Sequence, residues 1–548
     1  MLAQPSRRSS VIGRLALLAS LLLAAGLRFY RLGYQSYWND EGNTRVLIAR
    51  DVPTLLRNTA ADIHPPGYYL ILKAWRGLAG ESEFALRGFS ALAGVILVAL
   101  LWRLGREWFG PGAGRAAALL GAVNPFLIYY SQEARMYALL AMLSAASFLL
   151  FSRLWPTGLG RPGQNWPRPD WSGQGWSLIT VYSLTTALGL YTHYAFGFVV
   201  IAQNLAALLL AIRPFYHSHP DSLQLPSPHW SLVISHRNSL QLPSPHWSLV
   251  IRHWSFLQLL TLLLYLPWLP TAYRQLTGWP AAREFHPLWD SLLDLARYLA
   301  FGRTLPTGEA LWGLAAAGGL AAIGVWRLVT GLQSNPGPSR RPGPPAPRPF
   351  TLNPSALILL LWLLVPAGLT LAFGLLTAAF SKFLIVAVPP LCLLLGVAIS
   401  HRPAAISGQA SMVRRLLFPI GHWSLVLGVI CFTALSLANL YFNPAYFRDD
   451  YRGIAQYLAQ LSRPGDAVLT NSPNQVEAFA YYHRADAPGA APLFPLPDSR
   501  PLDPARTAAQ LTEIAGRFDR IFVLYWGDAQ ADPERFIESW LNANTFKA

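Results

Sequence analysis

The stretch Tyr37–Asp51 reads YWNDEGNTRVLIARD and follows the first apolar run of the chain. It places two carboxylates, Asp40 and Glu41, side by side at the mouth of that run. The pair could cap a helix that starts near Gly42, because acidic side chains are favoured at helix N-termini. It could also belong to a functional site, so the surrounding sequence must decide between the two interpretations.

The composition predicts a polytopic, mostly α-helical membrane protein. The 548 residues are 53% hydrophobic and 13% charged, with a mean hydropathy of +0.30, whereas soluble domains carry about 25% charge. About 20 apolar residues suffice for one helix to cross a bilayer. We predict about 11 transmembrane helices, at 11–29, 87–103, 113–129, 136–153, 177–192, 195–212, 255–271, 308–328, 355–378, 382–399 and 417–439. The first resembles a signal peptide, but the spans that follow favour an uncleaved helix.

The net charge of +16 supports this topology rather than a nucleic-acid partner. With a cytoplasmic N-terminus, the connections assigned to the inside are basic, as cytoplasmic loops usually are. They include 103–115, 153–168 and 327–348. We therefore expect a multi-pass protein of the cell membrane, with its C-terminal tail outside the cytoplasm.

The chain is expected to form two domains. Residues 1–439 form the membrane domain, with a long first outer loop at about 30–86, and residues 440–548 form a small extracytoplasmic α/β domain. In the tail, buried strands at 466–471 and 520–526 alternate with helical patterns at 449–462, 476–483 and 507–517,. The motif LQLPSPHWSLVI occurs at 223–234 and again at 240–251, too few copies for a solenoid,. Histidines of that loop could bind a metal, although the duplication explains several of them.

Further polar residues come to the predicted outer face at four other points. They are His64 before Pro65-Pro66, then Gln132, Glu133, Arg135 and Tyr137 in YYSQEARMYALL, then His193 in YTHY, and Lys382 in SKF. Each has a simpler explanation: a Glu133–Arg135 ion pair, a snorkelling Lys382 or a hydrogen-bonded interfacial His193. Those explanations do not predict that all of them share one face, and charges near membrane depth are usually functional.

An acid beside several cations at the outer leaflet suits group transfer from a lipid-linked phosphate. The carboxylate would deprotonate an acceptor hydroxyl, and the cations would hold the phosphate. A phosphate leaving group needs no general acid, so one base suffices. No cofactor is certain and no metal ligand is assigned, although Asp40, Glu41 and Glu133 could hold a divalent metal.

Three motifs together, WNDEGNTRVLIAR, HPPGYYLILKAW and SQEARMYALL, resemble the GT-C fold membrane glycosyltransferases. The similar group is the protein O-mannosyltransferase and aminoarabinose-transferase-like (family 39-like) superfamily, over residues 10–215 and more loosely 355–485. The resemblance implies a polyprenyl-phosphate-linked sugar donor, a lipid, protein or glycan acceptor, and an extracytoplasmic, inverting active site.

The resemblance also implies roles for individual residues. Asp40 matches the catalytic base and Glu41 its acidic neighbour. The residues that match donor phosphate or lipid binding are Arg135, Lys382, His64 and Tyr137. Those that match acceptor binding or support are Glu133, Gln132 and His193. Lys382 stands where relatives often have arginine, and lysine keeps the charge but loses the bidentate fork.

Two other functions fit the residues less well. A transporter or lipid flippase places charges near the midplane and often shows inverted repeats, whereas here the charges share one face and no such symmetry is visible. A non-catalytic scaffold that binds through the tail would leave Asp40, Glu133 and Lys382 unexplained.

Overall fold

The structure is a computed structural model that describes residues 7–154, 173–218, 245–278, 286–330, 353–377, 379–400, 412–471, 476–484, 490–499, 501–525 and 531–547. The first LQLPSPHWSLVI copy and the start of the second lie outside these residues, as do the histidine side chains of that loop.

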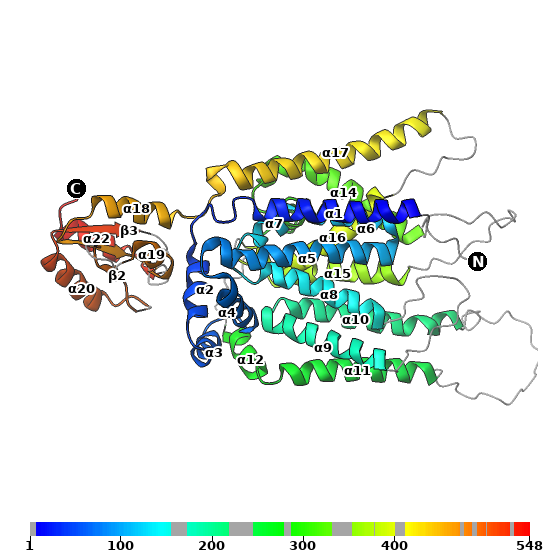
Figure 1. Ribbon diagram of the computed structural model, residues 1–548, viewed down its shortest axis with the longest axis horizontal. Coiled ribbons are helices and arrows are strands. Elements are labelled where there is room, and N and C mark those ends of the chain that lie inside the picture. The colour runs from blue at the N-terminus through cyan, green and yellow to red at the C-terminus, as the bar shows by residue number, and fades with distance from the viewer. Residues whose placement is uncertain are drawn as a thin grey trace, which may run out of the picture.

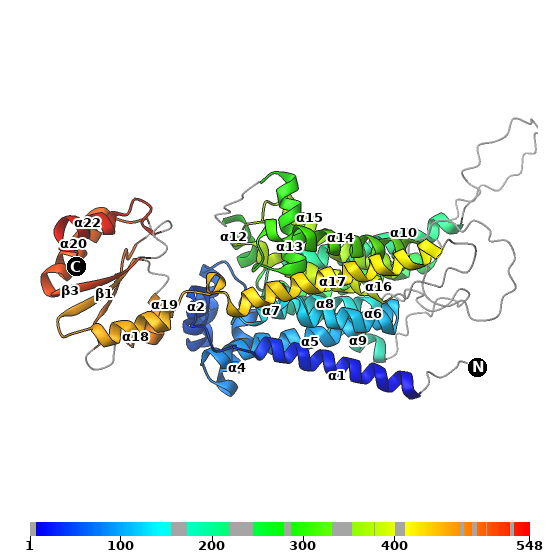
Figure 2. The same ribbon diagram turned by 90° about the horizontal axis from the view of Figure 1, so that it is seen from above.

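A bundle of long apolar helices forms most of the described chain (Figures 1 and 2). Its helices are α1 (Arg7–Phe29), α5 (Glu83–Phe109), α6 (Pro111–Val123), α7 (Pro125–Ser131), α8 (Tyr137–Leu154), α9 (Gly173–Thr192), α10 (Phe196–Ser218), α11 (Pro245–Tyr265), α14 (Thr307–Thr330), α15 (Pro354–Ala372), η2 (Ser381–Ala387), α16 (Val388–Ile399) and α17 (Met412–Phe442). The predicted multi-pass, mostly helical fold is confirmed.

The predicted number of eleven spans is not confirmed. Every predicted segment overlaps helix, but only seven helices in the described part are long and apolar enough to cross a membrane. An eighth is gained if α11 and α12 (Leu269–Gly278), which bend by 80°, are counted as one span. The segment 113–129 is broken at Asn124-Pro125: the Asn124 side chain caps α7, and proline cannot donate a backbone hydrogen bond,.

The segments predicted to lie outside gather at one end of the bundle. The helices α2 (Asn39–Ala49), α3 (Val52–Ala61), α4 (Gly67–Ala79) and α12 lie across that end, and the N-terminal end of α1 lies at the other (Figure 1). Helix α5 starts at the first end and carries Arg103 about 30 Å further along, at 1.5 Å per residue,. This separation agrees with the predicted topology, although the side of the membrane stays a prediction.

Beyond α2 lies the tail, a small α/β unit (Figure 2). Three parallel strands have the order β2–β1–β3. The elements are η3 (Pro444–Tyr446), α18 (Tyr451–Leu461), β1 (Asp466–Thr470), α19 (Val476–His483), β2 (Leu493–Pro495), α20 (Pro504–Arg517), β3 (Arg520–Leu524) and α22 (Phe536–Asn544). The two predicted strands and three predicted helices are present, whereas β2 and α22 were missed.

The tail packs directly on the first outer loop. A Cβ built on Gly42 of α2 would lie 2.5 Å from the Cα of Ala478 in α19, so the two helices approach backbone to backbone. Beside this contact, the Tyr482 hydroxyl donates to Glu83 and accepts from the backbone N–H of Tyr37. The tail therefore packs, through α19, against the helix that carries Asp40.

Candidate active site

Helix α2 presents the acidic pair in its first turn. It begins at Asn39, and Glu41 Oε2 lies 3.5 Å from the backbone nitrogen of Trp38, a long capping contact. The capping interpretation therefore holds in part for Glu41. It does not account for the strongest contacts of either carboxylate, which are made with arginine and lysine side chains.

Glu41 belongs to a chain of buried ion pairs, Arg87–Glu41–Arg448–Glu133, which we call the buried chain. Arg87 donates to both Glu41 oxygens, at 2.8 and 2.6 Å, and neither side chain is more than 1% exposed. Arg448 lies 3.5 Å from Glu41 and donates to Glu133 at 3.0 Å. Burial alone would raise the pKa of Glu41, but Arg87, Arg448 and the backbone N–H of Ala134 together outweigh burial, so the pKa is lowered.

Asp40 belongs to a second group, Asp40, Arg135 and Lys382, which we call the exposed cluster because its carboxylate is partly exposed, whereas Arg135 is buried. Asp40 Oδ2 lies 3.6 Å from Arg135 Nη2 and 4.0 Å from Lys382 Nζ, both beyond hydrogen-bond length,. The Asp40 side chain is 29% exposed and that of Lys382 18%. Asp40 is thus the carboxylate whose oxygens remain accessible to a substrate.

Arg135 is fixed on the loop side of the exposed cluster. Its Nη1 donates to Thr44 at 3.0 Å, to the Tyr69 hydroxyl at 3.3 Å and to the Asp40 carbonyl at 3.3 Å. Its Nη2 lies 3.4 Å from His64 Nε2, and the other His64 nitrogen lies 3.3 Å from Asp62. Burial lowers the pKa of His64, with a further contribution from Arg135, which favours the neutral ring as an acceptor from Arg135.

His193 and Tyr137 line the bundle side of the cluster. The backbone N–H of Ala195 donates to His193 Nδ1 at 3.0 Å, and burial lowers the pKa of His193 well below its usual range. Lys382 Nζ lies 5.2 Å from the centre of the Tyr137 ring, a cation–π distance,. The predicted donor-binding residues are therefore brought together around Asp40.

Glu133 and Gln132, both predicted for acceptor binding or support, have their described side-chain partners outside the Asp40 group. Glu133 pairs with Arg448 rather than with Arg135, and burial raises its pKa. Gln132 donates to carbonyls at the end of α1, at 2.9 Å for Tyr30 and 3.2 Å for Arg28. Gln132 therefore ties the loop to α1 and does not contact Asp40.

Three arginines of this region were not predicted. Arg87 stood at the expected start of a span, and Arg448 lies in the connection that follows α17. Arg303 lies between α13 (Leu288–Phe301) and α14, where its Nη1 is 3.4 Å from the Tyr130 hydroxyl. The only sequence signal was their position in outer segments, for Arg303 and Arg448, or at the outer end of a predicted span, for Arg87, where arginine is less expected than inside.

The carboxylates of this region face cations rather than one another. Glu41 and Glu133 each face an arginine, and Asp40 faces Arg135 and Lys382. Across the described residues, no group of three or more His, Cys, Asp and Glu side chains is placed to hold a metal. Four cations face three carboxylates in the two groups, which favours an anionic ligand,.

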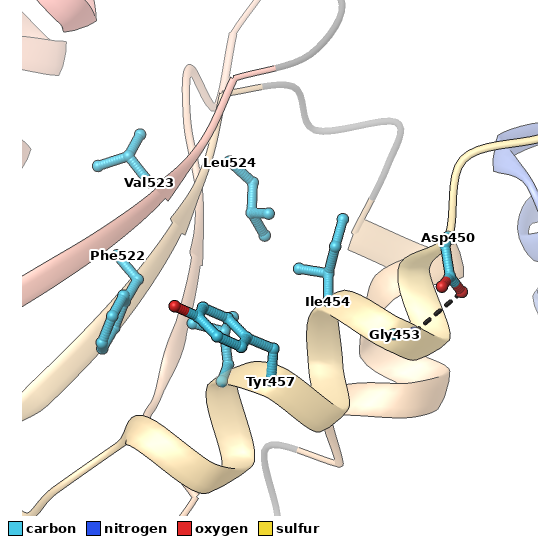
Figure 3. Close-up of a pocket in the computed structure, with 8 residues that line it drawn as sticks. Asp450, Gly453, Ile454, Tyr457, Phe522, Val523 and Leu524 are labelled. Atoms are coloured by element: carbon cyan, nitrogen blue, oxygen red, sulfur yellow. Dashed lines mark hydrogen bonds between the residues drawn. The ribbon is translucent and has the colours of Figure 1, made fainter. Parts of the chain in front are cut away.

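A cavity of about 420 Å³ lies in the tail, between α18 and β3 (Figure 3). Ile454 and Tyr457 line one side, and Phe522 and Leu524 the other. Among the described residues that line it, none has a basic side chain, and Asp450 accepts the backbone N–H of Gly453 at 2.9 Å.

Comparison with known structures decides the fold. ArnT from Cupriavidus metallidurans matches in its apo state with a TM-score of 0.51 and 13% identity, over 98% of this chain and 92% of that one. The chain has the GT-C fold. ArnT bound to undecaprenyl phosphate matches with a TM-score of 0.50 and 14% identity, over 99% and 96% of the two chains.

Two further comparisons agree with the predicted resemblance. The oligosaccharyltransferase AglB from Archaeoglobus fulgidus, in complex with an inhibitory peptide and a dolichol-phosphate, matches with a TM-score of 0.50 and 12% identity, over 89% of this chain and 65% of that one. Residues 63–220 match the family described as dolichyl-phosphate-mannose-protein mannosyltransferase. No curated protein sequence matches significantly. The predicted resemblance to GT-C glycosyltransferases is confirmed.

Proposed function

We propose that this chain is an integral-membrane glycosyltransferase that moves a sugar from a polyprenyl-phosphate donor to an acceptor outside the cytoplasm. One observation carries the proposal: Asp40, partly exposed, shares one carboxylate oxygen with Arg135 and Lys382. Undecaprenyl phosphate bound to ArnT and dolichol-phosphate bound to AglB supply the class of donor lipid.

In the proposed reaction, Asp40 removes the proton from an acceptor hydroxyl of a protein, lipid or glycan. The acceptor oxygen attacks the anomeric carbon as the bond to the phosphate breaks, with inversion. Arg135 and Lys382 stabilise the departing phosphate, with His64 and Tyr137 beside them. Glu41, which is enclosed by Arg87 and Arg448, supports the helix that carries Asp40.

Replacing the base tests the proposal. Purified protein in liposomes is given undecaprenyl phosphate carrying radiolabelled mannose, glucose or aminoarabinose, together with membrane extract as acceptor. Asp40→Asn should lower transfer by about 10²–10⁴-fold, the usual contribution of a general base. Asp290→Asn, at an exposed position in the first turn of α13, serves as the matched control.

Two results would contradict the proposal. Unchanged transfer by stably folded Asp40→Asn would remove Asp40 as the base. A labelled donor that wild-type protein moves across the bilayer but never consumes would favour a flippase.

A further inference from the structure

Arg448 joins the tail to both carboxylates of the buried chain. It follows η3 in the connection between α17 and α18, and only 12% of its side chain is exposed. Its backbone N–H donates to the Gln35 side chain at 2.9 Å, and its Nη1 donates to the Gln132 carbonyl at 3.2 Å. The guanidinium also lies 5.4 Å from the centre of the Tyr129 ring. Both the backbone N–H and the guanidinium of Arg448 therefore contact residues of the membrane domain.

Glu133 depends on Arg448 for its charge balance. Arg448 is the one ion-pair partner of Glu133 within the described ranges, and Glu133 Oε2 is buried there without a hydrogen-bond partner. The charged groups that face Glu133 are Arg448, Glu41 on α2, Lys382 on η2, and Arg303 before α14. The phenol of Tyr130 also faces it from α7. Removing Arg448 would leave Glu133 buried beside Glu41, a like charge.

The buried chain connects to the exposed cluster through backbone. Glu41 Oε1 accepts the N–H of Ala134 at 2.7 Å, and Ala134 stands between Glu133 and Arg135. Arg135 in turn contacts the carbonyl and the carboxylate of Asp40. A shift of Glu41 or Glu133 would thus move Arg135 relative to Asp40.

We propose that Arg448 is a positioning residue of the site: by pairing with Glu41 and Glu133 at once, it holds Arg135 and Asp40 in register. This inference rests on the proposed glycosyltransferase function. Arg448 does not contact the reacting atoms but acts through the two carboxylates. Because it belongs to the segment that leads into the tail, the tail connection completes the site.

The test compares Arg448→Gln with Arg452→Gln. Arg452 lies four residues further along the chain. Its side chain donates to Glu83 and to the Gly33 carbonyl, so it joins the tail to the first outer loop without a contact to Glu41 or Glu133. In the liposome assay with the donors above, Arg448→Gln should lower kcat about 10²-fold. A loss of this size is expected when a misplacement of about 1 Å separates Arg135 from its position beside Asp40. Arg448→Lys should recover part of this loss, and Arg452→Gln should stay within about threefold of wild type.

The pH profile separates positioning from a general loss of structure. Arg448 opposes the rise that burial imposes on the pKa of Glu133, so without Arg448 this carboxyl should protonate at higher pH. The acidic limb of the activity profile should then move to higher pH in Arg448→Gln and not in Arg452→Gln. If Arg448→Gln is poorly folded, Arg448→Gln/Glu133→Gln should recover thermal stability, because no unpaired charge remains buried.

Each failure can be recognised. Equal kcat and equal pH profiles for Arg448→Gln and Arg452→Gln, with active wild type, would overturn the positioning role. A double variant no more stable than a misfolded Arg448→Gln would overturn the pairing with Glu133. Wild-type protein inactive with every donor would instead count against the proposed function itself.

Discussion

Helix α2 contributes one carboxylate, Asp40 or Glu41, to each of two groups of charges. The two groups differ in burial and in the distances between their charged atoms. The buried chain, Arg87–Glu41–Arg448–Glu133, is largely shielded from solvent, with Arg448 12% exposed and the other three side chains at most 2%, and hydrogen bonds of 2.6–3.0 Å hold its two ends. The exposed cluster, Asp40–Arg135–Lys382, has contacts of 3.6–4.0 Å and an accessible carboxylate. The comparison teaches that two adjacent carboxylates can differ sharply in environment, and in the proposed function Glu41 supports the site while Asp40 faces the substrate.

The largest expected effect on stability comes from breaking the buried chain. Arg87→Ala would remove both guanidinium hydrogen bonds of the buried Glu41 and leave Arg448, at 3.5 Å, as its remaining ion-pair partner, which should lower the free energy of unfolding by about 3–5 kcal/mol,. Thermal unfolding in detergent measures the loss. Arg103→Ala, which removes an exposed ion pair with Glu107, should cost no more than about 1 kcal/mol. Equal melting temperatures for these two variants would contradict the distinction between the groups.

A smaller effect is expected where the tail supports α2. In Gly42→Ala the new Cβ would meet the backbone of Ala478 at 2.5 Å. Overpacking of this kind usually costs about 1–3 kcal/mol, and it should also lower turnover because α2 carries Asp40. Gly77→Ala on α4 is the matched control, since no atom lies within 4 Å of its new Cβ. If both variants melt and turn over alike, the tail does not brace α2.

The smallest effect concerns pH. His193 is buried, and its pKa is held well below the usual value near 6.5, first by burial and then by His64, Lys382 and Arg135,. In this pH range the unfolded chain binds a proton at His193 and the folded chain does not. The free energy of unfolding should therefore fall as the pH drops from about 7.5 to 5.5.

The change should be at most about 1.4 kcal/mol per pH unit for one group. His193→Asn keeps an acceptor for the backbone N–H of Ala195. Its melting temperature should differ less between the two pH values than that of the wild type. His286→Asn, at an exposed histidine, should leave the difference as it is. The prediction is wrong if the two variants show the same pH dependence.

The sequence predicted the helical segments and the common face of the site because both depend on local pattern. Apolar runs, basic connections and the position of Asp40 beside a span can all be read within about 20 residues. The number of spans was less predictable, since Asn124-Pro125 and the bend between α11 and α12 interrupt apolar runs without changing their hydropathy. The strand β2 has only three residues, Leu493–Pro495, too few for an alternating pattern.

The division of roles between Asp40 and Glu41 could not be predicted from local pattern. It depends on Arg87, 46 residues from Glu41, and on Arg448, which lies in the connection between α17 and α18. Nothing in the neighbourhood of either arginine indicates a carboxylate partner. Glu133 and Arg135 show the same limit, because their spacing suggested a mutual pair while each has a partner elsewhere.

The most direct test of the two-group account is a structure of the protein in lipid nanodiscs with undecaprenyl phosphate. The account predicts the phosphate at about 3 Å from the Arg135 guanidinium and the Lys382 ammonium, a charge-assisted hydrogen-bond distance. Asp40 should lie beside it, and the Glu41–Arg87 pair should be unchanged. A phosphate bound away from Arg135 and Lys382, or one that opens the Glu41–Arg87 pair and binds Arg87, would contradict the account.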